Sequence, residues 1–501
     1  MTNMTRRTLL IGSLGAASAL TVGGLAAYGW STSAVGPAVG SASEAVRTAE
    51  ATRRATDQRV VTARLTPRVS TIDLGGQSVQ TWAYGESVPG PLLRARAGDL
   101  LRVSVENALP AETSVHWHGI ALRNDMDGVP GITQSPIGAG AAFTYEFTAP
   151  DPGTYFYHPH SGVQLDRGLH GVLVIDDPQE PGGYDDEWIV VLDDWIDGTG
   201  TTPDEVLKKL QASGAQSGGG MGGMGGMGGM EASMQSPLLG GAGDIVYPHY
   251  LVNGRIAANP VTLSGKPGQR VRVRFVNAGS DTAFRVALGG HQMTITHSDG
   301  YPVQPAVTDA LIIGMGERFD VIVTLADGAF PLVASAEGKN GQGLAVVRTS
   351  PGAAAPAAGS TPAELNGRVL LGTDLVVGAP ARLPDRAVDT THDLVLGGSM
   401  AGYQWTLNGK RFPDTAPLEV RQGQRVRLRF QNRTMMFHPM HVHGHTFALT
   451  AGGARKDTVI VRPMQQVEVD FQADNPGQWA THCHNIYHAE AGMMTTISYR
   501  A

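Results

Sequence analysis

The segments GDLLRVSVEN (residues 98–107), GQRVRVRFVN (residues 268–277) and GQRVRLRFQN (residues 423–432) are three copies of one pattern. Each copy begins at a glycine suited to a turn and then alternates apolar and polar residues, which is the period of a half-buried β-strand. The spacing between the copies is that of domains rather than of a short solenoid repeat. The repeat therefore predicts a chain of three related β-domains.

The composition restricts the classes of protein to which the chain can belong. Of its 501 residues 17% are charged, and 66 Gly and 30 Pro indicate many turns between short strands. This composition excludes a coiled coil, a helical bundle and a wholly disordered chain. The net charge of −7 provides no positive field for a nucleic acid, so no nucleic-acid partner is expected.

Strand patterns and turn residues predict an all-β fold of three Greek-key β-sandwiches. The predicted domains span residues 56–178, 187–350 and 365–501. Residues 351–364, which are mostly Ala, Gly, Ser and Pro at their start, are predicted to link the second domain to the third. Residues 35–55 are predicted to be a linker before the first strand.

The N-terminus has the features of an export signal over residues 1–34. Arg6 and Arg7 precede a moderately apolar, Ala- and Gly-rich run to about Ala27. The paired arginines indicate the twin-arginine route, with an ordinary Sec signal or an uncleaved anchor as the alternative. We expect a secreted monomer that is extracellular, at the cell surface or periplasmic, with no stable membrane partner.

Ten of the sixteen histidines fall in four short motifs. Side chains at positions i and i+2 of a strand point the same way, so each His-x-His pair directs two imidazoles at one point. A metal ion needs this arrangement and an apolar core does not. The motifs are His116-Trp117-His118-Gly119, His158-Pro159-His160, His438-Pro439-Met440-His441-Val442-His443 and His482-Cys483-His484-Asn485-Ile486-Tyr487-His488.

Cys483 is the only cysteine of the chain, which excludes an intramolecular disulfide. On a strand it faces away from His482 and His484, so one strand can connect two metal sites. With His438 and His488 it forms a His₂Cys set, to which Met493 can add the weak axial thioether of a blue-copper site. The remaining eight histidines are too many for one ion, and they can hold three coppers between the first and third domains.

The other histidines are interpreted as structural, and the second domain as a copper-free spacer. His445 continues the alternation of His441 and His443 and is expected to support the site from outside. The five read as ordinary core or surface groups are His170, His249, His291, His297 and His392.

At these motifs, and over residues 56–501 as a whole, the sequence resembles the three-domain multicopper oxidases, the family of laccases, bilirubin oxidases and bacterial copper-efflux oxidases. The resemblance implies cupredoxin-like domains and four copper ions: one of type 1, one of type 2 and a type 3 pair. It also implies one-electron oxidation of a substrate at type 1 copper, transfer along the Cys-His strand and reduction of dioxygen to two waters.

The resemblance assigns a role to each ligand by position. Cys483, His482 and His484 would carry electrons between the sites, and Asp127 matches an acidic residue that relays protons in similar bacterial enzymes. Asp127 also suits a plain turn, since Gly128 follows it. The implied ligands are His438, Cys483, His488 and axial Met493 for type 1; His116 and His441 for type 2; and His118, His158, His160, His443, His482 and His484 for type 3.

A Met-rich segment at residues 218–234 bears on the substrate. Its methionines are separated mostly by Gly-Gly, and soft thioethers on such a tether suit Cu(I), although a plain solvent-exposed loop is the alternative. Similar copper-efflux oxidases have an Asp where this chain has Thr434, and similar laccases have a Glu where it has Ala489. Phenols, aromatic amines and Cu(I) therefore all remain open as substrates, with laccase-like activity favoured and cuprous oxidation in copper tolerance as the alternative.

Two other functions fit parts of the sequence. A copper store or carrier would use the Met-rich segment, but it has no use for a fully ligated three-copper cluster. A copper nitrite reductase lacks both the His-Cys-His strand and the third domain.

Replacing the single thiol tests the proposed type 1 ligand. Cys483→Ser should abolish the blue absorption and substrate turnover while the protein stays folded, because the thiolate is the only soft anionic ligand of the set. Absorption spectroscopy, oxygen uptake and circular dichroism measure the three effects. Blue colour retained in this variant would contradict the assignment.

Overall fold

The structure is a computed structural model that describes residues 36–180, 182–217 and 234–501, and Pro37–Ala501 forms one compact unit. The predicted export signal at residues 1–34 lies outside the described residues. So does the Met-rich segment, except for Met234 at its end.

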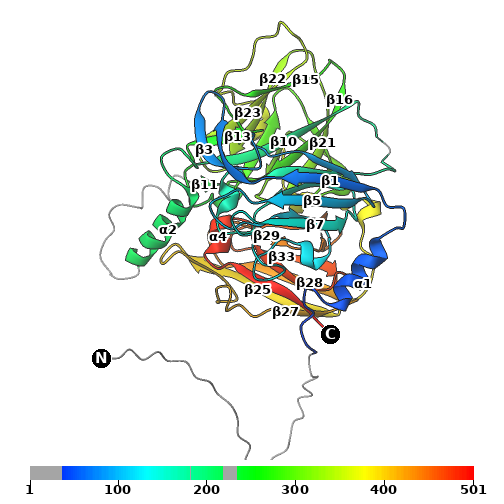
Figure 1. Cartoon of the computed structure of the whole chain (residues 1–501). Helices are drawn as coiled ribbons and strands as arrows, with labels where there is room; N and C mark the ends of the chain where they lie inside the picture. Colours follow the sequence, from blue (N-terminus) through cyan, green and yellow to red (C-terminus); the bar gives the residue numbers. More distant parts are fainter. Residues whose placement is uncertain (1–35, 181, 218–233) are drawn as a thin grey trace, which may run out of the picture. The chain divides into compact units, whose positions relative to one another are not determined.

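The first part of the chain, from β1 to β9 (residues 60–176), forms two sheets and a hairpin (Figure 1). One sheet has the strand order β1-β5-β7, the other has the order β4-β9-β8-β6, and β2 pairs with β3. Their bounds are β1 Val60–Leu65, β2 Arg68–Asp73, β3 Ser78–Ala83, β4 Leu93–Arg96, β5 Leu100–Glu106, β6 His116–His118, β7 Ala142–Thr148, β8 Gly153–His158 and β9 Gly171–Asp176, with 3₁₀ turns η1 at Asn124–Met126 and η2 at Gln164–Asp166.

The second part, from β10 to β23 (residues 186–348), forms two larger sheets. Their orders are β14-β13-β10-β16-β21-β18-β19 and β15-β23-β22-β17-β20-β24, and a short hairpin pairs β11 with β12. The bounds are β10 Asp186–Trp195, α2 Pro203–Ser217, β11 Gln235–Ser236, β12 Gly240–Gly241, β13 His249–Val252, β14 Arg255–Ile256, β15 Val261–Ser264, β16 Arg270–Asn277, β17 Phe284–Leu288, β18 Met293–Ser298, β19 Tyr301–Thr308, β20 Ala310–Ile313, β21 Arg318–Thr324, β22 Ala329–Ala336 and β23 Gln342–Arg348.

The third part again forms two sheets, in the orders β26-β25-β28-β33-β30-β31 and β27-β35-β34-β29-β32. The bounds are η3 Ala363–Asn366, β24 Val369–Leu370, η4 Gly372–Asp374, η5 Ala379–Ala381, β25 Thr390–Ser399, β26 Gln404–Leu407, β27 Leu418–Arg421, β28 Arg425–Asn432, β29 His438–Val442, β30 Phe447–Leu449, β31 Arg455–Lys456, β32 Thr458–Val461, β33 Gln466–Gln472, β34 Gln478–Cys483, α4 Ile486–Glu490 and β35 Met494–Arg500.

The three repeat copies become equivalent strands. β5, β16 and β28 each pair in parallel with an earlier strand, β1, β10 and β25 respectively. Each also pairs antiparallel with a later strand, β7, β21 or β33. The all-β prediction is confirmed, because strands dominate the described chain and the helices are few.

The structure differs from the predicted alternation in one copy. Arg272 and Arg274 of β16 are buried rather than exposed. Both guanidinium groups contact the Asp320 carboxylate of β21, at 2.6 and 3.0 Å. Burial of these charges is possible because each has a partner. β24 also pairs with β20 of the second part, although it lies inside the predicted third domain.

The structure describes residues 36–55 of the predicted linker. They contain the helix α1 (Glu44–Arg53), which begins at the N-cap Ser43. The Glu50 carboxylate on α1 is buried and accepts hydrogen bonds from the backbone N–H and the hydroxyl of Thr148, at 3.1 and 3.0 Å. Arg53 donates to Asn475 Oδ1 at 3.1 Å. The segment therefore ties β7 to the third part, which its polar composition alone did not reveal.

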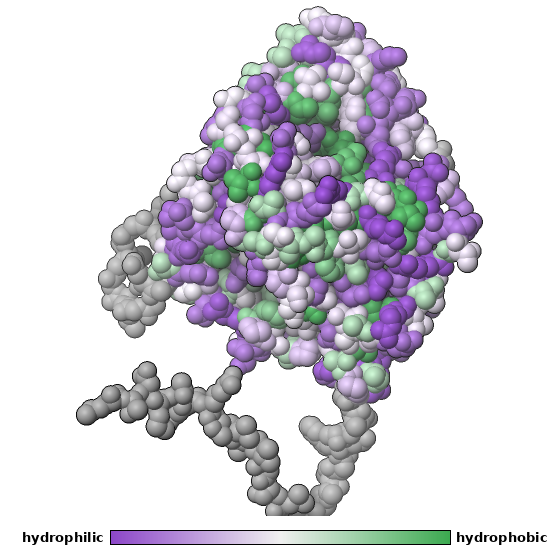
Figure 2. All heavy atoms as spheres, viewed as in Figure 1, coloured by the Kyte–Doolittle hydropathy of each residue, from purple (hydrophilic) through white to green (hydrophobic). Residues whose placement is uncertain are grey.

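None of the helices in residues 36–180, 182–217 and 234–501 has the length and apolar character needed to cross a bilayer. Hydrophilic and hydrophobic residues are intermixed on the face seen in Figure 2.

Glu50 provides a test of the tie made by α1. Glu50→Ala should lower the free energy of unfolding by about 1–3 kcal/mol, because it leaves a buried N–H and hydroxyl without their acceptor. Thermal unfolding measures the change. Arg47→Ala on the same helix, which removes only exposed contacts, those with Glu44 and with the Ala42 carbonyl, is the matched control and should have little effect. Equal effects of the two substitutions would contradict this role.

Candidate metal centre

Two strand pairs carry most of the histidine motifs. β6 pairs antiparallel with β8, so that His116 is opposite His158. In the third part β29 pairs with β34, so that His441 is opposite His482 and Met440 is opposite Cys483. Registry between strands thus fixes which histidines are neighbours.

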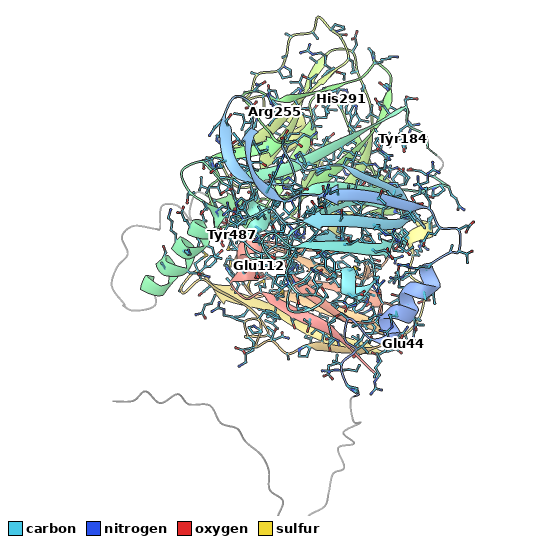
Figure 3. The ribbon with its side chains drawn as sticks, viewed as in Figure 1. Glu44, Glu112, Tyr184, Arg255, His291 and Tyr487 are labelled. Atoms are coloured by element: carbon cyan, nitrogen blue, oxygen red, sulfur yellow. The ribbon has the colours of Figure 1, made fainter. Side chains whose placement is uncertain are left out.

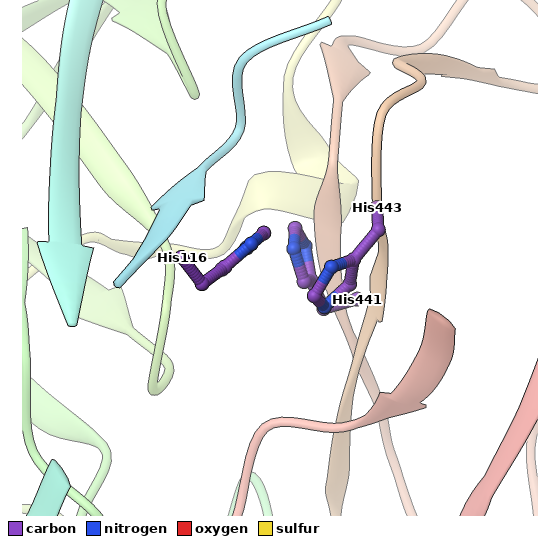
Figure 4. A group of neighbouring side chains, drawn as sticks. All are labelled: His116, His441 and His443. Atoms are coloured by element: carbon purple, nitrogen blue, oxygen red, sulfur yellow. The ribbon is translucent and has the colours of Figure 1, made fainter. Parts of the chain in front are cut away.

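The structure brings eight predicted histidines into one cluster, which we call the histidine cluster. The rings of His116 and His443 stack with centroids 3.9 Å apart, and those of His118 and His441 stack at 3.8 Å. Figure 4 shows His116 facing His441 and His443 across the boundary between the first and third parts. The members of the histidine cluster are His116, His118, His158, His160, His441, His443, His482 and His484.

The ring nitrogens of this cluster suit metal ligands. His116 Nδ1 donates to the Asp127 carbonyl at 2.8 Å, and His441 Nδ1 donates to the Asp457 carbonyl at 3.0 Å. These bonds leave Nε2 of each ring as a lone-pair donor to a metal, with no hydrogen-bond partner within the described chain. His484 has no partner at either nitrogen. Buried polar atoms are normally paired, so this set fits a bound ion.

The electrostatics of the cluster favour neutral imidazoles. Burial, together with the neighbouring rings, lowers the pKa of His482 to about 3 and holds the pKa of His158 and His484 well below the ordinary histidine value. Neutral imidazole is the form that binds a transition metal.

A second group lies on the other face of β34. Cys483 Sγ is 3.6 Å from Nδ1 of His438 and 3.6 Å from Nδ1 of His488, and all three residues are buried. Met493 is also buried, and its carbonyl accepts the Cys483 N–H at 3.1 Å. His488 is on α4, where Asn485 caps the helix by accepting from the backbone N–H groups of Tyr487 and His488.

Four residues beside this site were not assigned to it from the sequence: Asp244, Tyr403, Trp405 and Thr434. His488 Nε2 lies 3.0 Å from the Asp244 carboxylate, which also accepts a bond from the Tyr403 hydroxyl at 2.7 Å. The Trp405 ring lies 4.1 Å from that of His488. Neither Asp244 nor Trp405 belongs to a local motif, so no sequence signal marked them. Thr434, noted only for lacking a charge, lies 2.9 Å from His438 Nε2.

Asp127 lies beside the histidine cluster and is fully buried. Its carboxylate oxygens are 3.0 Å from His443 Nδ1 and 3.2 Å from His116 Nδ1. The predicted outer role of His445 agrees with its contacts, since its Nδ1 donates to the His443 carbonyl at 3.0 Å and its Nε2 accepts from the Tyr499 hydroxyl at 2.6 Å. Asp457, which the sequence analysis missed, lies 3.1 Å from His118 Nε2.

The histidines interpreted as structural belong to none of the metal-capable groups found in the described chain. His291, for example, accepts a bond from the Ala326 N–H at 2.9 Å.

The described end of the Met-rich segment is connected through Gly241 and Ala242 to Met435 and Met436, which precede His438 in the chain. Met234 accepts a bond from the Ala242 N–H at 3.1 Å, and Gly241 bridges to Met436. Met435, whose carbonyl accepts the Gly241 N–H at 2.9 Å, has a side chain that is 72% exposed.

Comparisons with known proteins agree over most of the described chain. Family models described as multicopper oxidase match residues 68–180, 186–352 and 386–501. The chain is 52% identical to the multicopper oxidase MmcO of Mycobacterium tuberculosis, over 88% of this chain and 87% of that protein. It is 31% identical to a copper resistance protein A homolog of Pseudomonas syringae pv. tomato, covering 85% and 90%.

Among solved structures, the laccase from Botrytis aclada superposes with a TM-score of 0.72 at 26% identity, covering 88% of each chain. Fet3p, a multicopper oxidase that functions in iron import, has a TM-score of 0.75 at 21% identity, covering 88% of this chain and 90% of that one, and shares the fold.

Proposed function

The chain belongs to the multicopper oxidase family, and from this premise we propose that it uses four copper ions to couple four one-electron oxidations of a small substrate to the reduction of dioxygen to two waters. When bound, copper supplies the one-electron redox chemistry and the site at which dioxygen is reduced. A single observation carries the proposal: β34 presents His482 to the histidine cluster and Cys483 to the second group, and His484, directly after the strand, returns to the histidine cluster.

The proposed ligands follow from the two groups of side chains. His438, Cys483, His488 and Met493 would hold type 1 copper. Their short mutual distances and their burial support this set, since a His₂Cys site with a weak thioether is typical of blue copper. The histidine cluster takes the other three ions, with His116 and His441 for type 2 and His118, His158, His160, His443, His482 and His484 for type 3.

The outer contacts orient the ligands. Thr434 and Asp244 hold the outer nitrogens of His438 and His488, so that the inner nitrogens face Cys483. Trp405 packs against the His488 ring and excludes water from that side. The site is thus prepared before the metal binds.

Asp127 is the proposed proton carrier for dioxygen reduction. Its Oδ1 is within 3.2 Å of His116 and has no hydrogen-bond partner among the described residues, while its Oδ2 contacts His443. A carboxylate in this position can hold a proton beside the place where oxygen is reduced.

Cu(I) is the substrate that the geometry supports best. Gly241, seven residues after the Met-rich segment, pairs with Met435 and Met436, and the Asp244 carboxylate next to His488 adds negative charge. Thioethers prefer Cu(I). The relative named for copper resistance agrees with a role in copper tolerance. Oxidation of phenols or aromatic amines is the second candidate, favoured by exposed Met435, Met464 and Val246 and by the laccase relatives.

Export by the twin-arginine route and a monomeric state stay part of the proposal on the basis of the sequence. Arg6 and Arg7 carry the first, and they lie outside the described residues.

Asp127→Asn tests the proton carrier. The variant keeps the size of the side chain but cannot exchange protons in the same way, so dioxygen should reoxidise the reduced enzyme more slowly, and increasingly so as pH rises and protons become scarce. Reduction of type 1 copper by substrate should be unchanged. Stopped-flow absorption separates the two rates. Asp125→Asn, which alters the neighbouring pair with Arg123, is the control. If the rate of reoxidation is unchanged at every pH, Asp127 is only a turn residue and does not carry protons.

Replacing Met221, Met224, Met227 and Met230 by Ser tests the substrate. The loop keeps its length, but its thioethers are gone, so the rate with Cu(I) should fall severalfold while phenol oxidation stays equal or rises. Oxygen uptake with each substrate measures the rates, with free copper controlled by a chelator. An equal loss with both substrates would contradict the preference for Cu(I).

A further inference from the structure

A buried arginine of the second part reaches the edge of the histidine cluster. Arg318, at the start of β21, is fully buried. Its two terminal nitrogens donate to the two carboxylate oxygens of Asp457, at 2.7 and 2.6 Å. Its Nε donates to the Thr154 carbonyl of β8 at 3.0 Å. One guanidinium group therefore contacts the first and third parts from the second.

Asp457 in turn contacts two proposed copper ligands. Its Oδ1 is 3.1 Å from His118 Nε2 and 3.4 Å from His441 Nδ1, and its carbonyl accepts from His441 Nδ1 at 3.0 Å. Thr458 donates to the same Oδ1 at 2.9 Å. Asp457 thus contacts both rings, that of His118 through its carboxylate and that of His441 mainly through its carbonyl.

Two glycines leave the space that these groups occupy. Gly119 has φ = +87°, and a Cβ there would lie 2.3 Å from an Arg318 nitrogen and 2.6 Å from Asp457 Oδ2. Gly316 has φ = +83°, and a Cβ there would lie 2.9 Å from His484 and 3.0 Å from His118. Glycine at these two positions therefore leaves room for the Arg318–Asp457 ion pair and for the neighbouring histidine rings.

Further charges hold the pair in place. The Asp299 carboxylate accepts hydrogen bonds from three backbone N–H groups: that of Arg318 at 2.9 Å and those of Asp457 and Thr458, each at 3.2 Å. Lys456 contacts Asp299 and Glu317, both at 3.1 Å. All of these side chains are buried, so each charge needs its partner.

We propose that Arg318 is a positioning residue for the three-copper cluster: its guanidinium group grips both oxygens of Asp457, and Asp457 then holds His118 and His441 in the orientation that binds copper. A bidentate arginine pair fixes direction as well as charge, which a lysine cannot reproduce. The second part is accordingly more than a copper-free spacer. This inference rests on the proposed function, because it concerns ligands of the proposed cluster.

The same sheet offers a matched control. Arg272 of β16 is also buried and contacts Asp320 through two nitrogens, at 3.1 and 2.6 Å. Its other contacts are Glu180 and His297, neither of which belongs to the histidine cluster. Arg272→Lys therefore also removes a buried guanidinium group from this sheet, but one that contacts no residue of the histidine cluster.

The test compares Arg318→Lys, Arg272→Lys and the parent, each loaded with copper and freed of excess metal. We expect Arg318→Lys to keep the blue absorption, to show a changed type 2 signal in electron paramagnetic resonance, and to hold its cluster copper about 10–100-fold more weakly against a chelator. Arg272→Lys should match the parent. A normal type 2 signal and normal retention in Arg318→Lys, or equal losses in both variants, would overturn the proposal.

Asp457→Asn provides a second variant that does not depend on the folding of Arg318→Lys. It retains the shape of the side chain but loses the charge that the guanidinium grips, so it should show the same spectroscopic change with the blue absorption intact. The double variant should be no worse than Asp457→Asn alone, since Arg318 acts through Asp457. A normal cluster in Asp457→Asn would overturn the proposal. A parent that binds no cluster copper would instead refute the proposed function.

Discussion

Eight imidazoles share one small, mostly buried volume, and this constraint governs the rest of the structure. Imidazoles at such distances cannot all be protonated, and several of their nitrogens have no hydrogen-bond partner in the described chain. The arrangement is reasonable only if a metal replaces those partners. Because the ligands come from the first and third parts, binding of copper would also join these parts.

The strand β34 divides this interior into two sites. Successive side chains of a strand face opposite sides, so Cys483 cannot join the two histidines that flank it. The pairing of β34 with β29 then sets His482 beside His441 and Cys483 beside Met440. Because of this strand geometry, Cys483 and the histidines beside it connect the two proposed metal sites through one short stretch of backbone.

Residues outside the proposed ligand set support both sites. The Tyr487 hydroxyl of α4, labelled in Figure 3, bonds to Asp166 of the first part, and Asn485 bonds to Asp281 of the second. Asp244 reaches His488 from a loop of the second part, and Arg318 reaches Asp457 from β21. The second part holds no proposed copper ligand, yet it contributes contacts to the surroundings of both groups.

The sequence by itself determined the features that depend on local periodicity. Alternation within residues 98–107, 268–277 and 423–432 predicted three equivalent strands, and each His-x-His motif predicted two rings on one face. Those rules act between near neighbours in the chain, so they predict the strands without the tertiary structure, although packing buries Arg272 and Arg274 against the alternation. Cys483 and the histidines could therefore be singled out before the fold was known.

Only the tertiary structure decided which distant residues complete the sites. Asp457 is 339 positions from His118, and Asp244 is 244 positions from His488. A lone Asp, Trp or Arg in a loop or strand carries no periodic signal, and its partner is chosen by packing. The helix α1 was likewise missed: Ser43 caps it locally, but the contacts of Glu50 with Thr148 and of Arg53 with Asn475 join residues far apart in the chain.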